Sequence, residues 1–150
     1  MILEKIGDIL SIGEGVIVHG CNAQGKMNSG IAKQVRKDYP EAYLIYMDNY
    51  RSGLGSISYY SASDKKIIVN GITQEFYGRD PSALYVSYDA MFTVFDNILR
   101  DDFLRKNAER YGLNFPLIGC GLANGDWSIV REIIDRTIPE SIKKTLWILE

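Results

Sequence analysis

Hydrophobic and polar residues alternate along this chain with more than one period, and the changes of period predict where strands and helices lie. Gly15–Gly20 is rich in β-branched residues and bounded by glycines, which is typical of a buried strand. Met1–Lys5 predicts an edge strand, and Thr145–Leu149 predicts a final strand. Ser56–Tyr60 and Lys66–Asn70 predict two further strands, which we expect to pair as a hairpin across a polar turn.

Helical patterns separate these strands. Gly30–Asp38 begins as a helix, and Pro40 either ends that helix or opens a second one. Within Leu84–Leu99 the apolar residues have the spacing of one helix face, and Ser128–Ile138 repeats that pattern. Because strands alternate with helices, we expect a sheet that is covered by helices on both faces.

Composition limits the classes of function that need to be considered. The chain has 150 residues, of which 46% are hydrophobic, so we expect one domain over residues 1–150. A formal net charge of −2 does not favour nucleic-acid binding. The sequence has no apolar run of membrane-spanning length and no signal-peptide pattern, so we expect a soluble, cytoplasmic protein. Two cysteines and one histidine favour neither a disulfide scaffold nor a metal site, and we expect no cofactor.

Two glycine-rich loops stand out because each one follows an apolar run and leads into a helix. The first loop is Gly20–Gly30, and the second loop is Gly119–Asp126, which follows the short apolar run Phe115–Ile118. Ligands of α/β folds bind beyond the carboxyl ends of strands. Glycines let backbone N–H groups approach a phosphate, and a helix N-terminus adds partial positive charge. The loops therefore predict a site for two phosphates, although each is also compatible with an ordinary tight turn.

The motifs of this chain together resemble the macro domain family. They are Gly7-Asp8-Ile9, Asn22 before a loop that ends in Ser29–Ala32, and Pro116–Leu122 followed by Trp127. The resemblance runs from Ile6 to the end of the chain. The form Ile-Gly-Cys-Gly-Leu is similar to the branch with the terminal ADP-ribose protein glycohydrolase and the yeast ADP-ribose-1″-phosphate phosphatase, whose compact members occur in bacteria and phages. The resemblance implies a three-layer α/β/α macro domain with a mixed central sheet that binds ADP-ribose.

The resemblance also implies roles for particular residues. Asp8 matches the acidic residue that accepts a hydrogen bond from the adenine amino group, Ile9 its neighbour, and Asn22 the residue that bonds the distal ribose. From the residues alone, a helix cap is the simpler interpretation of Asp8, and a turn is the simpler interpretation of Asn22. The implied ligand-binding residues are Asp8, Ile9, Asn22, Ala23, Met27, Asn28, Ser29, Gly30, Ile31, Gly119, Cys120, Gly121, Leu122, Ala123, Asn124 and Gly125.

The chain departs from the glycohydrolase relatives at two positions. Gln74 stands where those relatives have the lysine that attacks the sugar, and glutamine has no nucleophilic amine. Ala123 stands where they have an aspartate, and alanine cannot act as an acid or base. We therefore expect no lysine-dependent glycohydrolase activity. Asp126 is a candidate replacement for the missing acid, with a helix cap as its alternative. Asn28 replaces a frequent glycine and predicts a less open first loop.

Three functions remain in competition. The first is binding of ADP-ribose with hydrolysis of ADP-ribose-1″-phosphate, in which Asn22 and Asp126 are the candidate catalytic residues that orient a water. The second is a non-catalytic reader of ADP-ribose, free or attached to proteins. The third is an unrelated nucleotide-binding domain that shares only the loop design. Recognition of adenine at Asp8 separates the third from the others, and release of phosphate separates the first from the second.

The remaining polar residues have simpler interpretations. His19 is interpreted as a hydrogen-bonded core residue. Cys21 and Cys120 have no basic neighbour in the sequence and are interpreted as small buried residues. The polar and aromatic segment Gln74–Asp80 follows a strand, so we expect it to line or cover the site, with the individual roles of Gln74, Tyr77 and Arg79 left open.

Overall fold

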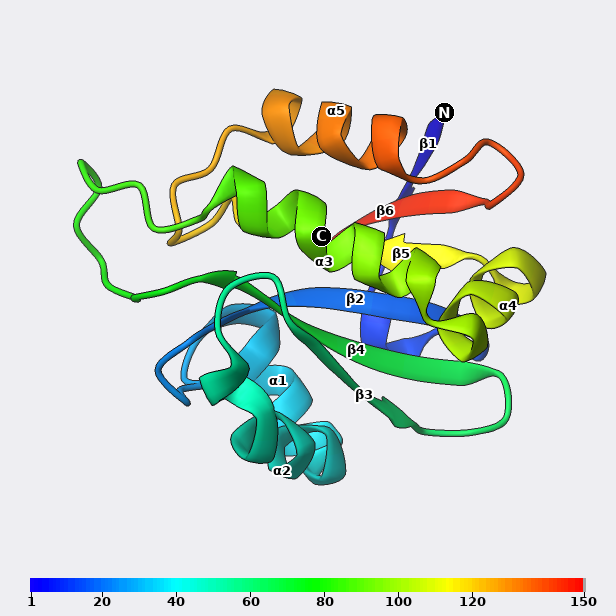
Figure 1. The fold of residues 1–150 in the computed structure, drawn as a ribbon, viewed down its shortest axis with the longest axis horizontal. Helices are drawn as coiled ribbons and strands as arrows, with labels where there is room; N and C mark the ends of the chain where they lie inside the picture. Colours follow the sequence, from blue (N-terminus) through cyan, green and yellow to red (C-terminus); the bar gives the residue numbers. More distant parts are fainter. Residues whose placement is uncertain (150) are drawn as a thin grey trace.

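A mixed sheet with strand order β1-β6-β5-β2-β4-β3 forms the centre of the fold (Figure 1). The computed structural model describes residues 1–149. The strands are β1 (Ile2–Ile6), β2 (Gly15–Asn22), β3 (Ile57–Ser61), β4 (Lys66–Gln74), β5 (Leu113–Phe115) and β6 (Lys144–Ile148). The pairs β1–β6, β6–β5, β5–β2 and β2–β4 are parallel, and β3 is antiparallel to β4. The expected hairpin and the expected edge strand are both confirmed.

Helices cover both faces of this sheet. The helices are α1 (Gly30–Asp38), α2 (Pro40–Asn49), α3 (Tyr88–Arg100), α4 (Asp102–Tyr111) and α5 (Trp127–Thr137), with short 3₁₀ helices η1 (Ile9–Ser11) and η2 (Tyr50–Ser52). Figure 1 shows α1 and α2 below the sheet and α3 and α5 above it. α4 also packs on the α3 side, since Leu104 and Ala108 belong to the same apolar cluster as the buried face of α3. The three-layer α/β/α arrangement is therefore confirmed.

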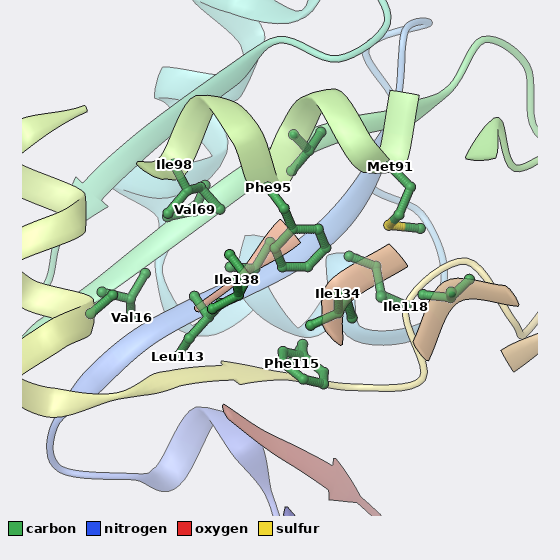
Figure 2. Packing of buried hydrophobic residues seen from close by; sticks show 14 of the residues in the cluster. Val16, Val69, Met91, Phe95, Ile98, Leu113, Phe115, Ile118, Ile134 and Ile138 are labelled. Carbon is green, nitrogen blue, oxygen red and sulfur yellow. The ribbon is translucent and has the colours of Figure 1, made fainter. Parts of the chain in front are cut away.

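The larger apolar cluster fills the space between the sheet and helices α3, α4 and α5 (Figure 2). Phe95 of α3 and Phe115 of β5 meet edge to face, with ring centroids 6.2 Å apart and planes at 86°. This is a favourable geometry for two aromatic rings. Ile118, which follows β5, is also buried in this cluster. The start of the second glycine-rich loop is therefore anchored in the core.

The opposite face of the sheet carries smaller apolar clusters and one buried polar pair. Side chains alternate along β2, so Ile17 packs against Val35 of α1 and Ala42 of α2, while its neighbours face α3. His19 follows on the same face and is fully buried. Its Nε2 lies 2.7 Å from Oδ1 of Asn70 on β4, which confirms the interpretation of His19 as a hydrogen-bonded core residue.

Several element boundaries differ from those expected from the sequence. β2 continues through Asn22 and β4 through Gln74, because sheet pairing between them extends past the apolar runs. α3 begins only at Tyr88, where the Ser87 side chain accepts a hydrogen bond from Ala90 N and caps the helix. Helix α4 was not expected, because it is mostly polar and buries only Leu104 and Ala108.

The position of β5 also differs from the one expected from the sequence. β5 is Leu113–Phe115, so the apolar run that begins at Phe115 starts where the strand ends. Pro116 follows, and proline cannot donate to a sheet ladder.

Among residues 1–149, no helix is long and apolar enough to cross a membrane.

Candidate functional site

A cavity of about 1120 Å³ lies at the carboxyl ends of the five parallel strands. Its walls come from the segments that follow β1, β6, β5, β2 and β4, so each parallel strand contributes to it. Its volume slightly exceeds the usual range of ligand pockets, which is about 300–1,000 Å³. The topology therefore brings both glycine-rich loops to one place, as the sequence predicted.

Asp8 lies at the end of the cavity that follows β1. Its Oδ1 accepts a hydrogen bond from Leu10 N at 2.9 Å, so the side chain caps the 3₁₀ helix η1. Its other carboxylate oxygen accepts no hydrogen bond from residues 1–149 and remains available. Asp8 and Ile9 both line the cavity. The structure thus confirms the capping interpretation of Asp8, whereas its contact with adenine stays a prediction with which the second oxygen is compatible.

The N-terminus of α1 forms part of the wall next to β2. Ser29 occupies the N-cap position of α1, but its side chain makes no capping hydrogen bond. By contrast, the helices on the opposite face of the sheet, α3, α4 and α5, have side-chain caps from Ser87, Asp101 and Asp126. Asn28, Ser29, Gly30 and Ile31 all line the cavity. Uncapped N–H groups at a helix N-terminus favour an anionic ligand.

Asn22 lies at the cavity wall, but its polar atoms bond the protein itself. Its Oδ1 lies within hydrogen-bond distance of Gln24 N, Lys26 N and the Tyr46 hydroxyl, at 3.0, 3.2 and 3.0 Å. Its Nδ2 donates to Lys26 O at 2.8 Å. One amide hydrogen is left for a ligand. The turn interpretation of Asn22 therefore describes most of what its side chain does.

The second loop folds back on itself and leaves several N–H groups free. Gly125 N donates to Gly119 O at 2.8 Å, and Asn124 N donates to Gly121 O at 3.0 Å. Gly125 cannot be larger, because a Cβ there would lie 2.4 Å from Gly119 O. Among residues 1–149, no acceptor takes the N–H groups of Gly119, Gly121, Leu122 and Ala123, all of which line the cavity.

Five of the implied site residues do not line the cavity. Met27 is buried beneath the first loop with Tyr46, and Ala23 packs against the same cluster. Asn124 and Gly125 donate backbone hydrogen bonds within the second loop, and the Asn124 side chain also bonds Asp80 O. Asp126 is exposed, and its Oδ1 accepts hydrogen bonds from the backbone N and the hydroxyl of Ser128, which lower the pKa of its carboxyl. As expected under its alternative interpretation, Asp126 is the N-cap of α5.

Two parts of the wall were missing from the residues implied by the resemblance. Trp147, Ile148 and Leu149 at the end of β6 line the cavity near the segment after β1. The pairing of β6 with β1 brings these three residues to the cavity, and no local sequence pattern predicts that pairing. Gln74, Tyr77 and Arg79 also line the cavity, so the expectation that the segment after β4 lines the site is confirmed.

Neither cysteine is prepared for nucleophilic chemistry. Burial raises the pKa of the Cys120 thiol to about 11, and the charge of Asp126 adds to that effect. Burial alone raises the pKa of Cys21 even further above its usual range. Both thiols therefore stay protonated near neutral pH. Within residues 1–149, no cluster of three or more His, Cys, Asp or Glu side chains could hold a metal ion.

Solved structures with this arrangement of strands and loops include a protein from Bacteroides thetaiotaomicron, with a TM-score of 0.83 and 27% identity over 98% of this chain and 99% of that chain. A macrodomain protein from Streptomyces coelicolor has a TM-score of 0.76 and 23% identity over 99% of both chains. The chain has the macrodomain fold. The fold implied by the resemblance of its motifs to the macro domain family is thereby confirmed.

The chain is also similar in structure to a protein solved with ADP-ribose, and in sequence to a phage protein. The chain matches 42% of the length of Thermosipho africanus DarTG, which was solved in complex with ADP-ribose, with a TM-score of 0.75 and 19% identity over 99% of the chain. An uncharacterized 17.5 kDa protein from the tk-vs intergenic region of Enterobacteria phage T4 is 29% identical over 90% of this chain and 89% of its own length. No family model matches the chain.

A third group of relatives is similar to the macrodomain over a shorter stretch. An ADP-ribose 1″-phosphate phosphatase from Aspergillus clavatus is 36% identical over 59 residues, or 39% of this chain. That match spans only 30% of the phosphatase's own length. Gln74 and Ala123 both line the macrodomain cavity, at the two positions that depart from the glycohydrolase pattern.

Proposed function

We propose that this macrodomain binds ADP-ribose along the carboxyl edge of its sheet. The observation that carries the proposal is the order of chemical groups along the cavity. An acidic acceptor, Asp8, lies beyond β1, free N–H groups lie beyond β5 and β2, and the cation Arg79 lies beyond β4. Adenine, the two phosphates and the terminal ribose follow one another in the same order along an ADP-ribose molecule.

The dimensions of the sheet support this assignment. From β1 to β4 there are four steps between neighbouring strands, and each step is about 4.8 Å, so the strand ends extend over about 19 Å. An elongated ligand with chemically distinct ends can therefore contact the segments after all five strands. The complex of Thermosipho africanus DarTG with ADP-ribose supports the same ligand for this chain.

Calorimetric titration of the purified protein with ADP-ribose tests this proposal. We expect a dissociation constant in the micromolar range, or about −7 to −8 kcal/mol. The matched control is the analogue with hypoxanthine in place of adenine, which lacks the amino group that Asp8 is proposed to accept. We expect that analogue to bind more weakly. A flat titration with ADP-ribose at millimolar concentration contradicts the proposal.

Hydrolysis of ADP-ribose-1″-phosphate is a second candidate function, favoured by the partial similarity to the Aspergillus clavatus phosphatase. Asp126 caps α5 outside the cavity wall, and Asn22 has one amide hydrogen to spare. Catalysis would therefore depend mainly on backbone N–H groups that stabilise charge on the phosphate. Incubation with ADP-ribose-1″-phosphate and measurement of released phosphate tests it. Binding without release favours a non-catalytic reader, of free ADP-ribose or of ADP-ribosylated proteins.

A further inference from the structure

The segment between β4 and α3 lies beside the second loop, at the same end of the molecule (Figure 1). Tyr77, Gly78 and Arg79 in this segment line the cavity. Tyr85 and Val86, at its far end, donate their N–H groups to Ala123 O at 3.0 and 3.3 Å. The two segments are therefore joined where the second loop presents its free N–H groups.

Within residues 1–149, one side chain makes the other hydrogen bonds between these two segments. Nδ2 of Asn124 donates to Asp80 O at 2.9 Å and to Ala83 O at 2.6 Å. Both hydrogens of this amide are thus used on backbone carbonyls that lie about forty residues away in sequence. Asn124 has φ = 62°, and no other non-glycine residue among 1–149 has positive φ. Asparagine tolerates this left-handed conformation better than most residues do.

Arg79 directly precedes the residue that Asn124 holds. Within residues 1–149, the Arg79 guanidinium makes no ion pair and no hydrogen bond, whereas Arg100, Arg105 and Arg136 pair with carboxylates on their own helices. The nearest acid in sequence, Asp80, instead accepts hydrogen bonds from Ser82. An unpaired, exposed cation therefore lies at the wall of a cavity that is otherwise largely apolar and rich in backbone N–H groups.

We propose that Asn124 is a positioning residue that holds Arg79 at the β4 end of the cavity, where the guanidinium binds a phosphate on the terminal ribose. This inference rests on the proposed function, because the adenine end must lie at Asp8 for the terminal ribose to reach β4. A guanidinium can bind a phosphate through two parallel hydrogen bonds, which a neutral ribose hydroxyl does not match. The preferred ligand class is therefore ADP-ribose phosphorylated on its terminal ribose.

The first test needs no ligand. Asn124→Gly removes the amide but keeps a residue that adopts φ = 62° without strain. Hydrogen exchange of the free protein is expected to become at least tenfold faster between residues 77 and 83, with little change in β4. The matched control is Asn97→Ala, which removes a comparable bond, from Nδ2 to Gly55 O at 2.9 Å, away from the cavity. Unchanged exchange in Asn124→Gly overturns the positioning role.

The second test compares two ligands, ADP-ribose and ADP-ribose-1″-phosphate, with ³¹P spectra confirming that the latter stays intact. We expect the wild type to prefer the phosphorylated ligand. Arg79→Ala and Asn124→Gly should each lower the affinity for the phosphorylated ligand about tenfold. The affinity of each variant for ADP-ribose should fall less than about twofold. The double variant should be no weaker than Arg79→Ala, because Asn124 acts through Arg79. Asn97→Ala should change neither affinity.

The outcomes separate this inference from the proposed function. If the wild type binds ADP-ribose but does not prefer the phosphorylated form, only the inference is overturned. The same holds if Asn124→Gly weakens both ligands equally, or if its effect adds to that of Arg79→Ala, as a purely structural role would require. If the wild type binds neither ligand, the proposed function fails and the inference fails with it.

Discussion

The Tyr46 hydroxyl in α2 lies 2.6 Å from the backbone oxygen of Asn22 and 3.0 Å from its side-chain oxygen. Burial raises the pKa of the Tyr46 hydroxyl above its usual range, so it remains a donor. The same Asn22 side chain also holds the backbone of Gln24 and Lys26. The residue at the end of β2 therefore fastens the first loop to α2 before any ligand arrives.

We expect Asn22→Ala to act first on stability. The substitution leaves the backbone N–H of Gln24 without its acceptor and Lys26 O without its donor, while Lys26 N keeps the Tyr46 hydroxyl, which should lower the free energy of unfolding by about 2–4 kcal/mol. Tyr46→Phe, the milder control, should lower it by about 1–2 kcal/mol. Urea unfolding measures both. If Asn22→Ala keeps wild-type stability but loses its affinity for ADP-ribose, Asn22 is chiefly a ligand contact.

Asp8 allows a sharper separation of structure from binding. Asp8→Asn can still cap η1 through its amide oxygen, but it then turns an NH₂ group toward the place of the free carboxylate oxygen. We expect Asp8→Asn to leave the melting temperature unchanged and to weaken the binding of ADP-ribose by about 1.5–3 kcal/mol. Asp8→Ala should lose both the cap and the affinity. Calorimetry and thermal unfolding measure the two effects, and unchanged affinity in Asp8→Asn argues against adenine recognition by this residue.

His19 predicts how stability depends on pH. Burial lowers its pKa from 6.5 to about 4, against the opposing effect of the hydrogen bond with Asn70. Between those values, as the pH falls, histidine gains a proton in the unfolded chain but not in the folded protein. Folding stability contributed by the neutral imidazole is thus present above pH 6.5 and is lost toward pH 4, by about 3 kcal/mol in all.

Urea unfolding at several pH values between 7 and 4 measures this dependence. The matched variant is His19→Gln, whose amide nitrogen can replace Nε2 as the donor to Asn70 but does not titrate. We expect the stability of the variant to fall less steeply with decreasing pH than that of the wild type. Equal slopes for the two proteins would mean that another group carries the pH dependence.

The last prediction concerns covalent chemistry at the sugar. Nε2 of Gln74 donates to Phe76 O at 2.7 Å, and Ala123 occupies the position of the missing acid. Without an amine and a carboxylate at these positions, we expect no release of ADP-ribose from ADP-ribosylated glutamate and no covalent sugar adduct. Mass spectrometry of the protein after incubation with such a conjugate is the measurement. A mass increase matching an attached sugar would refute the prediction.

Much of the fold could be predicted from local patterns. The β-branched run before Gly20, the helix face of α3 and the Gly30 start of α1 all follow from spacing and backbone preference. The two glycine-rich loops could be placed at one sheet edge, because parallel strands end on the same side. Helix α4 was not predicted, although Asp101 caps it and its buried residues Leu104 and Ala108 lie one turn apart, because most of its residues are polar.

The sequence by itself determined which groups this protein can bring to a ligand: an acid at Asp8, two loops of small residues, and no amine at Gln74. Tertiary structure decided which of those groups are free wherever the partner is distant in the chain. Asn22 is occupied in part by Tyr46, 24 residues away, whereas Asp126 is occupied by the nearby Ser128, as its helix-cap interpretation anticipated. Arg79 lies at the cavity wall next to Asp80, whose carbonyl oxygen accepts a hydrogen bond from the distant Asn124. Hydrogen-bond partners far apart in the chain depend on packing, so no local pattern reveals whether a polar group is still available.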